Sequence, residues 1–141
     1  MDGCRNGDME VVDIDHVALR VTDIESALEF YADTLDMEVL DSERYENDET
    51  PFVAVVAGGR HVHLVPTEDE EIDVGGEHVC FLLRSSERDT GDEIDALIEK
   101  IENAGYEVED GEPYDRYGAY GYDPAVYVRD PDGRRVELKL H

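Results

Sequence analysis

Long apolar runs, basic residues and cysteine are all scarce in this chain of 141 residues. No apolar stretch approaches the roughly 20 residues that a membrane-spanning helix needs. The acidic N-terminus also lacks the apolar core of a signal peptide, so we expect a cytoplasmic protein without a membrane partner. Only two cysteines are present, Cys4 and Cys80. This excludes a disulfide framework and a zinc site built from cysteine pairs.

Positively charged residues are also scarce. Twelve basic residues stand against 38 acidic ones, which gives a formal net charge of −26 at pH 7. A polyanion repels nucleic acid and anionic membrane surfaces, so neither is expected as a partner. Only Lys100 and Lys139 are lysines. An acidic, lysine-poor composition indicates a halophilic protein from a salt-accumulating cytoplasm, because concentrated salt screens self-repulsion over a short distance.

The hydrophobic residues, 40% of the chain, fall in regular blocks after a flexible tail expected over residues 1–12. A first module is predicted over residues 13–67. It opens with an alternating strand that ends at Val21, followed by a helix whose capping box is Thr22 with Glu25. Gly58-Gly59 indicates a hairpin. Extended runs are expected over residues 37–45, 51–57 and 61–66.

The pattern then repeats after an acidic linker over residues 68–76. In the second module, residues 77–141, a strand is predicted over His78–Arg84. A helix is expected over residues 91–104, with Gly105 just beyond its end. Extended runs are expected over residues 106–109, 117–128 and 134–140, with a turn at residues 130–133.

The order β-α-β-β-β therefore occurs twice, with His16 aligned over His78 at an offset of 78 − 16 = 62 residues. One module of about 60 residues would leave a face of its sheet uncovered. The sequence thus predicts an α+β fold in which paired βαβββ modules form a curved mixed sheet around a cleft, with the helices outside.

Histidines and one glutamate occupy matching places in the two repeats. His16 and His78 lie opposite the apolar face of their strands, and so do His63 (or His61) and Glu137 in the two closing strands. A single strand histidine is more often a hydrogen-bonded core or rim residue. The symmetric placement of several such residues favours a divalent metal site, since imidazole and carboxylate are ligands for Zn, Ni, Co, Mn and Fe(II).

Three motifs resemble those of a known superfamily. They are His16-Val17-x-Leu19-x-Val21 with Ser26-Ala27-x-x-Phe30-Tyr31 and Leu35-Asp36-Met37, then His78-Val79-Cys80, and finally Tyr127-x-x-Asp130-Pro131-x-Gly133-x-x-x-Glu137. Over residues 13–140 the chain resembles the vicinal-oxygen-chelate (VOC) superfamily, which includes glyoxalase I, extradiol dioxygenases, methylmalonyl-CoA epimerase and fosfomycin- and bleomycin-resistance proteins. It is most similar to glyoxalase I. Asp36 replaces the glycine of the family, which is tolerable because Asp can adopt a left-handed conformation.

The resemblance implies one divalent ion per site (Ni, Co, Zn, Mn or Fe), held by His16, His63, His78 and Glu137. His63 is a departure, because glyoxalase I usually has Glu or Gln at that position. The implied activity is that of a metal-dependent lyase, which converts the hemithioacetal of an α-oxoaldehyde and a thiol into a 2-hydroxyacyl thioester via an enediolate. Glu137 is the expected base.

The resemblance also suggests substrate contacts. Arg20 matches an arginine that binds the carboxylate of the thiol in glyoxalase I, although Thr67 replaces the asparagine that usually assists it. Tyr120 and Tyr127 are further candidates, because a tyrosine-rich stretch is suited to walling a cleft. Two alternatives are an Fe(II) extradiol dioxygenase and a non-catalytic binder of a drug or small metabolite. A homodimer is expected, with the modules paired either within or between chains.

Overall fold

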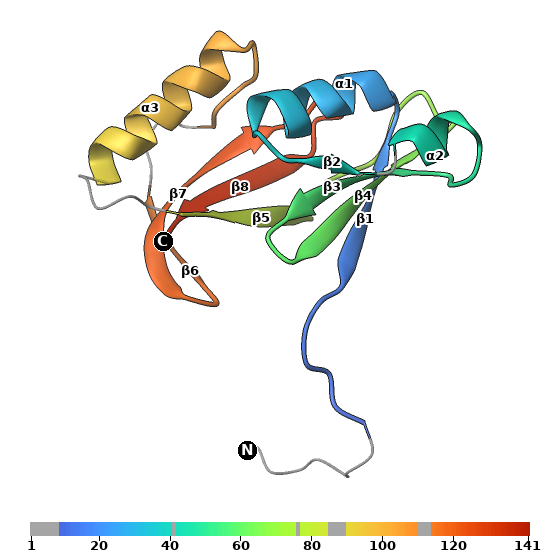
Figure 1. Cartoon of the computed structure of the whole chain (residues 1–141). Helices are drawn as coiled ribbons and strands as arrows, with labels where there is room; N and C mark the ends of the chain where they lie inside the picture. The colour runs from blue at the N-terminus through green and yellow to red at the C-terminus, as the bar shows by residue number, and fades with distance from the viewer. Residues whose placement is uncertain (1–8, 41, 76, 85–89, 110–113) are drawn as a thin grey trace.

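The computed structural model describes residues 9–40, 42–75, 77–84, 90–109 and 114–141, which form two modules of similar architecture (Figure 1). Cys4 lies outside the described residues. The first module contains β1 (His16–Val21), α1 (Ile24–Leu28), the π-helical η1 (Glu29–Thr34), β2 (Val39–Leu40), α2 (Ser42–Glu46), β3 (Val53–Ala57) and β4 (Arg60–Pro66). The second contains β5 (His78–Leu83), α3 (Thr90–Asn103), β6 (Tyr114–Gly118), β7 (Gly121–Arg129) and β8 (Arg135–Leu140).

Each module builds one mixed sheet of four strands with the same topology. The strand order is β1-β4-β3-β2 in the first sheet and β5-β8-β7-β6 in the second. The opening and closing strands run parallel in both modules, and the other neighbours are antiparallel. This confirms the predicted α+β fold of two repeated modules.

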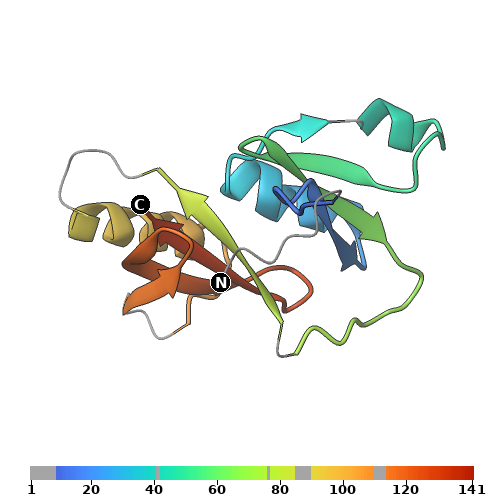
Figure 2. The ribbon, with the colours of Figure 1, turned by 90° about the horizontal axis from the view of Figure 1, so that it is seen from below.

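The helices α1 and α3 lie on one side of the two sheets (Figure 1), and the sheets lie side by side when seen from the opposite side (Figure 2). We call this opposite side the helix-free face. Apolar residues such as Val21, Leu64 and Leu138 alternate onto the helix side of their strands and are fully buried. The core therefore forms between the helices and the sheets, and it leaves the helix-free face for polar chemistry.

Aromatic residues of η1 join the two modules into one core. The ring of Phe30 contacts that of Tyr106 at 4.9 Å, and the ring of Tyr31 lies 6.3 Å from that of Phe81. Phe30 and Tyr31 are fully buried. Burial of such large side chains contributes about 2–3 kcal/mol each, so this contact resists separation of the modules.

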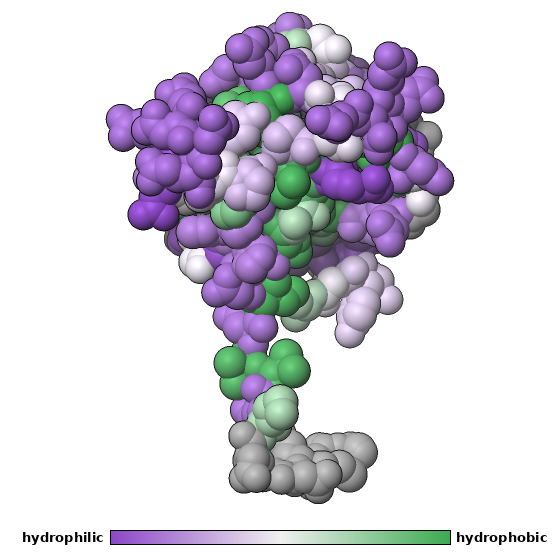
Figure 3. All heavy atoms as spheres, turned by 90° about the vertical axis from the view of Figure 1, so that its right-hand side faces the viewer, coloured by the Kyte–Doolittle hydropathy of each residue, from purple (hydrophilic) through white to green (hydrophobic). Residues whose placement is uncertain are grey.

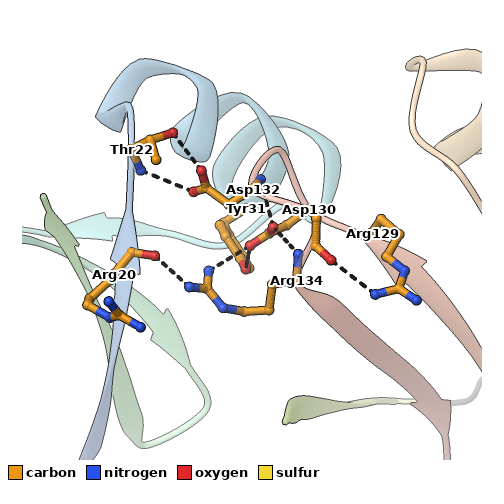
Figure 4. Close-up of polar contacts among 8 residues, drawn as sticks. Arg20, Thr22, Tyr31, Arg129, Asp130, Asp132 and Arg134 are labelled. Carbon is orange, nitrogen blue, oxygen red and sulfur yellow. Dashed lines mark hydrogen bonds and ion pairs between the residues drawn. The ribbon is translucent and has the colours of Figure 1, made fainter. Parts of the chain in front are cut away.

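A buried polar network forms a second link between the modules (Figure 4). The Tyr31 hydroxyl donates to the Asp130 carboxylate at 2.6 Å, and the Arg134 guanidinium donates to the same carboxylate at 2.8 Å. Arg134 also donates to the backbone oxygen of Arg20 at 2.5 Å. The start of β8 is thereby fixed beside the end of β1.

Local details of the first module differ from the sequence predictions. The helix is capped by Asp23, whose side chain accepts from the Ser26 backbone N at 3.1 Å, and the Thr22 hydroxyl instead donates to Asp132 of the second module at 2.5 Å. The extended run predicted over residues 37–45 is wrong beyond β2, because residues 42–46 form α2. The left-handed conformation expected for Asp36 is confirmed by a φ of 59°.

In the second module, the extended run predicted over residues 106–109 forms no full strand but pairs with β7 through an isolated antiparallel bridge between Val108 and Val128. The Glu109 backbone N donates to the Tyr127 oxygen at 2.8 Å, and the Arg129 backbone N donates to the Glu107 oxygen at 3.1 Å. The predicted run over residues 117–128 is two strands, because Gly118 pairs with Gly121 and closes a tight hairpin. The positive φ of 96° at Gly105 confirms the predicted helix end. No helix within the described ranges is long and apolar enough to span a membrane.

Candidate functional site

His16 and His63 form the first half of the candidate site. Position 18 of β1 pairs with His63 of β4, so His16 and His63 project from the same side of adjacent strands. Their rings stack with centroids 4.2 Å apart, and the opposite side of the His63 ring stacks on Phe52 at 4.0 Å. The ring of His61 lies 5.9 Å from that of His63. Both histidines left open by the sequence thus lie near His16, and His63 is in direct contact with it.

Asp15 lies in the segment just before β1 and holds the ring of His16. Its carboxylate is 2.7 Å from Nδ1 of His16, and this hydrogen bond lowers the pKa of Asp15. A carboxylate at one ring nitrogen directs the other nitrogen outward, an arrangement common for histidines that bind metals.

His78 and Glu137 form the second half of the site. Nε2 of His78 is 3.1 Å from Oε1 of Glu137, which is 6% exposed. The parallel register pairs Cys80 with Glu137, which places the thiol on the same face as the carboxylate. Burial, followed by the charge of Glu137, raises the pKa of Cys80 to about 12. The thiol is therefore protonated at neutral pH.

Tyr127 lies beside this second pair on β7, opposite Glu137 in the register. Its ring meets the His78 ring edge to face at 5.5 Å. Burial and the charge of Glu137 raise the pKa of the Tyr127 hydroxyl. The guanidinium carbons of Arg116 and Arg135 lie 4.8 and 4.2 Å from the centre of the ring. The second half-site therefore combines a carboxylate, an imidazole, a phenol and two guanidinium groups.

Two cavities lie along the boundary between the modules. A groove of about 480 Å³ is lined by β1 residues including Arg20 and by His78 of β5. A second cavity of about 640 Å³ is lined by Met37, Phe81 and Tyr120 among other residues. The predicted substrate residues therefore do not all line one cavity, because Arg20 lines the groove with His78 and Tyr120 lines the other cavity.

The predicted ligands lie as two pairs, and within the described ranges no three His, Cys, Asp or Glu side chains are grouped closely enough to hold a metal ion. Three imidazoles and one carboxylate match the donor chemistry of a divalent transition metal, but each pair supplies only two donors. The four-ligand site remains a prediction, and the structure shows what it requires: the two pairs must be brought together.

The sequence interpretation left the role of Arg116 undefined and missed Arg135. The signal that brings them to Tyr127 lies in the strand register: Arg116 pairs with Asp123, four residues before Tyr127, and Arg135 pairs with Arg129, two residues after it. All these positions therefore share the face of Tyr127.

Comparison with known proteins places the chain in a superfamily. The sequence profile of the Glyoxalase/Bleomycin resistance protein/Dioxygenase superfamily matches residues 13–138. The curated "Virulence protein STM3117" of Salmonella typhimurium is 28% identical over 134 residues, which cover 91% of this chain and 83% of the relative. The crystal structure of that protein matches with a TM-score of 0.69 at 25% identity, covering 94% of this chain and 99% of the other.

Two further solved structures share the fold. An integron cassette protein of V. cholerae has a TM-score of 0.71 at 24% identity, covering 94% of this chain and 98% of that one. The fosfomycin resistance protein FosX of Listeria monocytogenes has a TM-score of 0.68 at 18% identity, covering 94% and 95%. With the profile match across nearly the whole chain, the repeated modules lead to one conclusion: this chain belongs to the glyoxalase/bleomycin resistance/dioxygenase (VOC) superfamily.

Proposed function

We propose that this protein is a divalent-metal-dependent, glyoxalase I-like lyase that works as a homodimer. Each site would take His16 and His63 from one chain and His78 and Glu137 from the other. The observation that carries the proposal is the division of one ligand set into two pairs, each preassembled on the helix-free face. Superfamily membership supports a small-molecule substrate and a divalent metal.

The placement of the pairs favours ligands from two chains over ligands from one. Arg134 donates a hydrogen bond to the backbone oxygen of Arg20. The residue after it, Arg135, pairs with His78 in the register of β8 and β5. His16 precedes Arg20 by four strand residues, or about 13 Å. Nitrogen ligands of one ion lie about 2 Å from it, and so only about 4 Å from each other at most. A second chain is the simplest source of the missing pair.

The segment before β1 also supports a dimer. It extends away from the body of the molecule (Figure 1), and its apolar side chains stand out in Figure 3. Met9, Val11, Val12 and Ile14 are 63–95% exposed. Apolar side chains gathered on one exposed segment are typical of an interaction site. This segment ends directly before His16, and a partner that completes the site would lie within its reach.

The metal would supply a Lewis acid that polarises two neighbouring oxygens of the substrate. Glu137 would accept the carbon-bound proton of the hemithioacetal on a carboxylate oxygen and return it to the adjacent carbon. The His78 contact and the burial of Glu137 hold that oxygen in one place and keep bulk water from the proton. Arg20 would bind a carboxylate of the thiol, and Tyr120 and Tyr127 would wall the substrate.

An Fe(II) extradiol dioxygenase is the second candidate, because His78, Glu137 and one further histidine would form a two-histidine, one-carboxylate triad beside Tyr127. A metal-free binder is the third. Retention of polar ligand types at all four positions argues against it, since a sequestering cleft would tolerate apolar residues there.

Metal analysis separates the enzymes from the binder. Protein purified without added metal, then stripped with a chelator and reloaded, should hold about one divalent ion per chain. Glu137→Gln should lose metal or activity, whereas His141→Ala, outside the ligand set, should retain both. Lack of stoichiometric binding of any divalent ion would exclude both enzyme functions.

Activity assays then separate the two enzymes. Thioester formation from methylglyoxal with several small thiols tests the lyase, and oxygen consumption with catechols tests the dioxygenase. Thioester formation that is unchanged in His16→Ala and Glu137→Gln would refute the assigned site.

A further inference from the structure

The segment before β1, residues 9–15, carries more exposed apolar surface than a single chain uses, and we call it the N-terminal arm. The arm extends away from the body of the molecule (Figure 1). Val11 is 95% exposed and Val12 is 80% exposed. Exposed apolar side chains gathered in one place indicate a contact that a single chain does not supply.

The cavity of about 640 Å³ also presents apolar side chains to solvent. Its lining includes Leu82 of β5 and Tyr120, which are 46% and 61% exposed. In the described sheets β5 pairs only with β8, so the other edge of β5 offers its backbone N–H and C=O groups to another chain. A surface that combines apolar side chains with an open strand edge is suited to an extended apolar segment.

The charges of the arm and the cavity show which interaction holds them together. The charged residues of the cavity lining are Asp36, Glu38 and Arg60, and those of the arm are Glu10, Asp13 and Asp15. Lys100 forms an ion pair with Asp36 at 2.6 Å, and Arg60 donates to Asp13 at 3.0 Å. The cations near the cavity thus already contact carboxylates, and docking of the arm must depend on apolar contact and backbone pairing.

The arm and the cavity belong to one contiguous patch. Arg60, the first residue of β4, lines the cavity and also holds Asp13 at the root of the arm. In a dimer with twofold symmetry, both chains use the same patch for the interface. A patch that contains both an arm and a cavity can therefore be self-complementary, with each arm in the cavity of the other chain.

The division of the metal ligands over two chains brings the cavity of the partner close to the arm. Cys80 and Leu82 follow His78 on the same face of β5, and both line the cavity. If His78 of a partner meets His16, the cavity begins two strand residues away, or about 7 Å. The arm spans seven residues from Met9 to His16, which reach about 23 Å when extended.

We propose that the N-terminal arm of each chain docks in the cavity of a second copy of this chain, along the open edge of β5. The inference rests on the proposed function in taking the two halves of the metal site from two chains. It adds the surface that receives the arm, and it requires no bound metal. Docking would cover Val12 on one chain and Leu82 on the other.

The first test measures the dissociation constant of the metal-free, full-length dimer by sedimentation, which makes it independent of lyase activity. Leu82→Ser truncates the receiving surface, Val12→Asp alters the arm, and the double variant completes a mutant cycle. Tyr122→Ser is the matched control, because Tyr122 is 71% exposed but lies outside the cavity lining. Thermal unfolding of each variant checks that it is folded.

We expect Leu82→Ser to raise the dissociation constant about 10-fold or more, because each dimer contains two docked arms and loses the burial of a leucine at both. The double variant should be less impaired than the product of the single effects, since both changes remove one contact. Tyr122→Ser should dimerise like wild type. Raising the salt concentration should strengthen the dimer, because salt screens the repulsion between two chains of net charge −26.

The second test identifies the chain that receives the arm. Cys4→Ser and Cys80→Ser remove both native thiols, and Val12→Cys is then combined with Leu82→Cys. Oxidation should produce a covalent dimer in non-reducing electrophoresis, whereas an arm docked in its own chain would produce a bridged monomer. In the control, Val12→Cys is combined with Glu99→Cys on the exposed side of α3, and this pair should remain mainly monomeric.

The proposal is overturned if the wild type is monomeric, if Leu82→Ser dimerises like wild type, if the bridge forms within one chain, or if the control pair crosslinks as well. Stoichiometric metal binding without an effect of Leu82→Ser on the dimer would refute arm docking and leave the metal site standing. Coupled effects of Val12→Asp and Leu82→Ser in a protein that binds no metal would support arm docking and refute the lyase.

Discussion

A complementation experiment tests whether the two halves of the site come from different chains. One variant combines His16→Ala with His63→Ala and loses the stacked pair. The other combines His78→Ala with Glu137→Gln and loses the pair joined at 3.1 Å. Each homodimer would then contain two defective sites, each with two of the four ligands. Neither variant alone should bind a divalent ion stoichiometrically, because two donors do not close a tetrahedral or octahedral site.

Mixing the two variants changes the outcome in a calculable way. Free exchange of chains in equal amounts produces about half heterodimers. In each heterodimer one site has all four ligands and the other has none. About one quarter of the wild-type metal content should therefore return on mixing, with the same fraction of any thioester-forming activity.

The assay is elemental analysis of the mixture after unfolding and joint refolding, followed by gel filtration to remove free metal. The control refolds each variant alone under the same conditions. If the site were built within one chain, every chain in the mixture would still lack one pair, and no metal would return. That result would refute the shared site and would leave the paired arrangement of the ligands without a functional explanation.

The remaining predictions concern stability and assembly. Asp130→Asn should lower the free energy of unfolding by about 3 kcal/mol in denaturant titrations, because the buried Arg134 loses its counter-charge and Tyr31 loses its charged acceptor. A loss below about 0.5 kcal/mol would contradict the role of this network in linking the two modules. Glu109→Gln should destabilise the protein at neutral pH by about 1–2 kcal/mol. Since the pKa of Glu109 is lower in the folded protein than in the unfolded chain, its contribution is present above the unfolded pKa and is lost as the pH falls through the folded pKa. The difference from wild type should therefore shrink in acid, and a difference independent of pH would contradict it. Val12→Asp should raise the dissociation constant of the dimer about 10-fold or more in sedimentation experiments, because the Val12 side chain, 80% exposed in one chain, would lose an apolar contact with the partner. An unchanged dissociation constant would show that this segment lies outside the interface.

Local patterns sufficed to predict much of the fold. Alternation of apolar residues identified β1, β5 and β8, and the spacing of apolar residues identified the two main helices. These predictions succeeded because burial on one face imposes a period that survives in any tertiary context. The prediction of residues 37–45 as extended failed since a two-residue strand followed by α2 is too short to establish a period.

The helix cap shows how tertiary structure overrides a local motif. Thr22 with Glu25 fits a capping box, yet the Thr22 hydroxyl bonds to Asp132, which is 110 residues away in the chain. Asp23 takes over the cap. A neighbouring module supplied a better partner, and no local pattern contains that information.

The composition and spacing of the sequence determined the two-module fold, the charge excess, and the side of each strand that carries histidine or glutamate, because these follow from a period of two and from counting. Only the tertiary structure decided how these side chains are grouped. The register between strands places His63 against His16, His78 against Glu137, and Arg116 over Tyr127. Such pairings depend on contacts between segments tens of residues apart, whose free energies a one-dimensional pattern does not record.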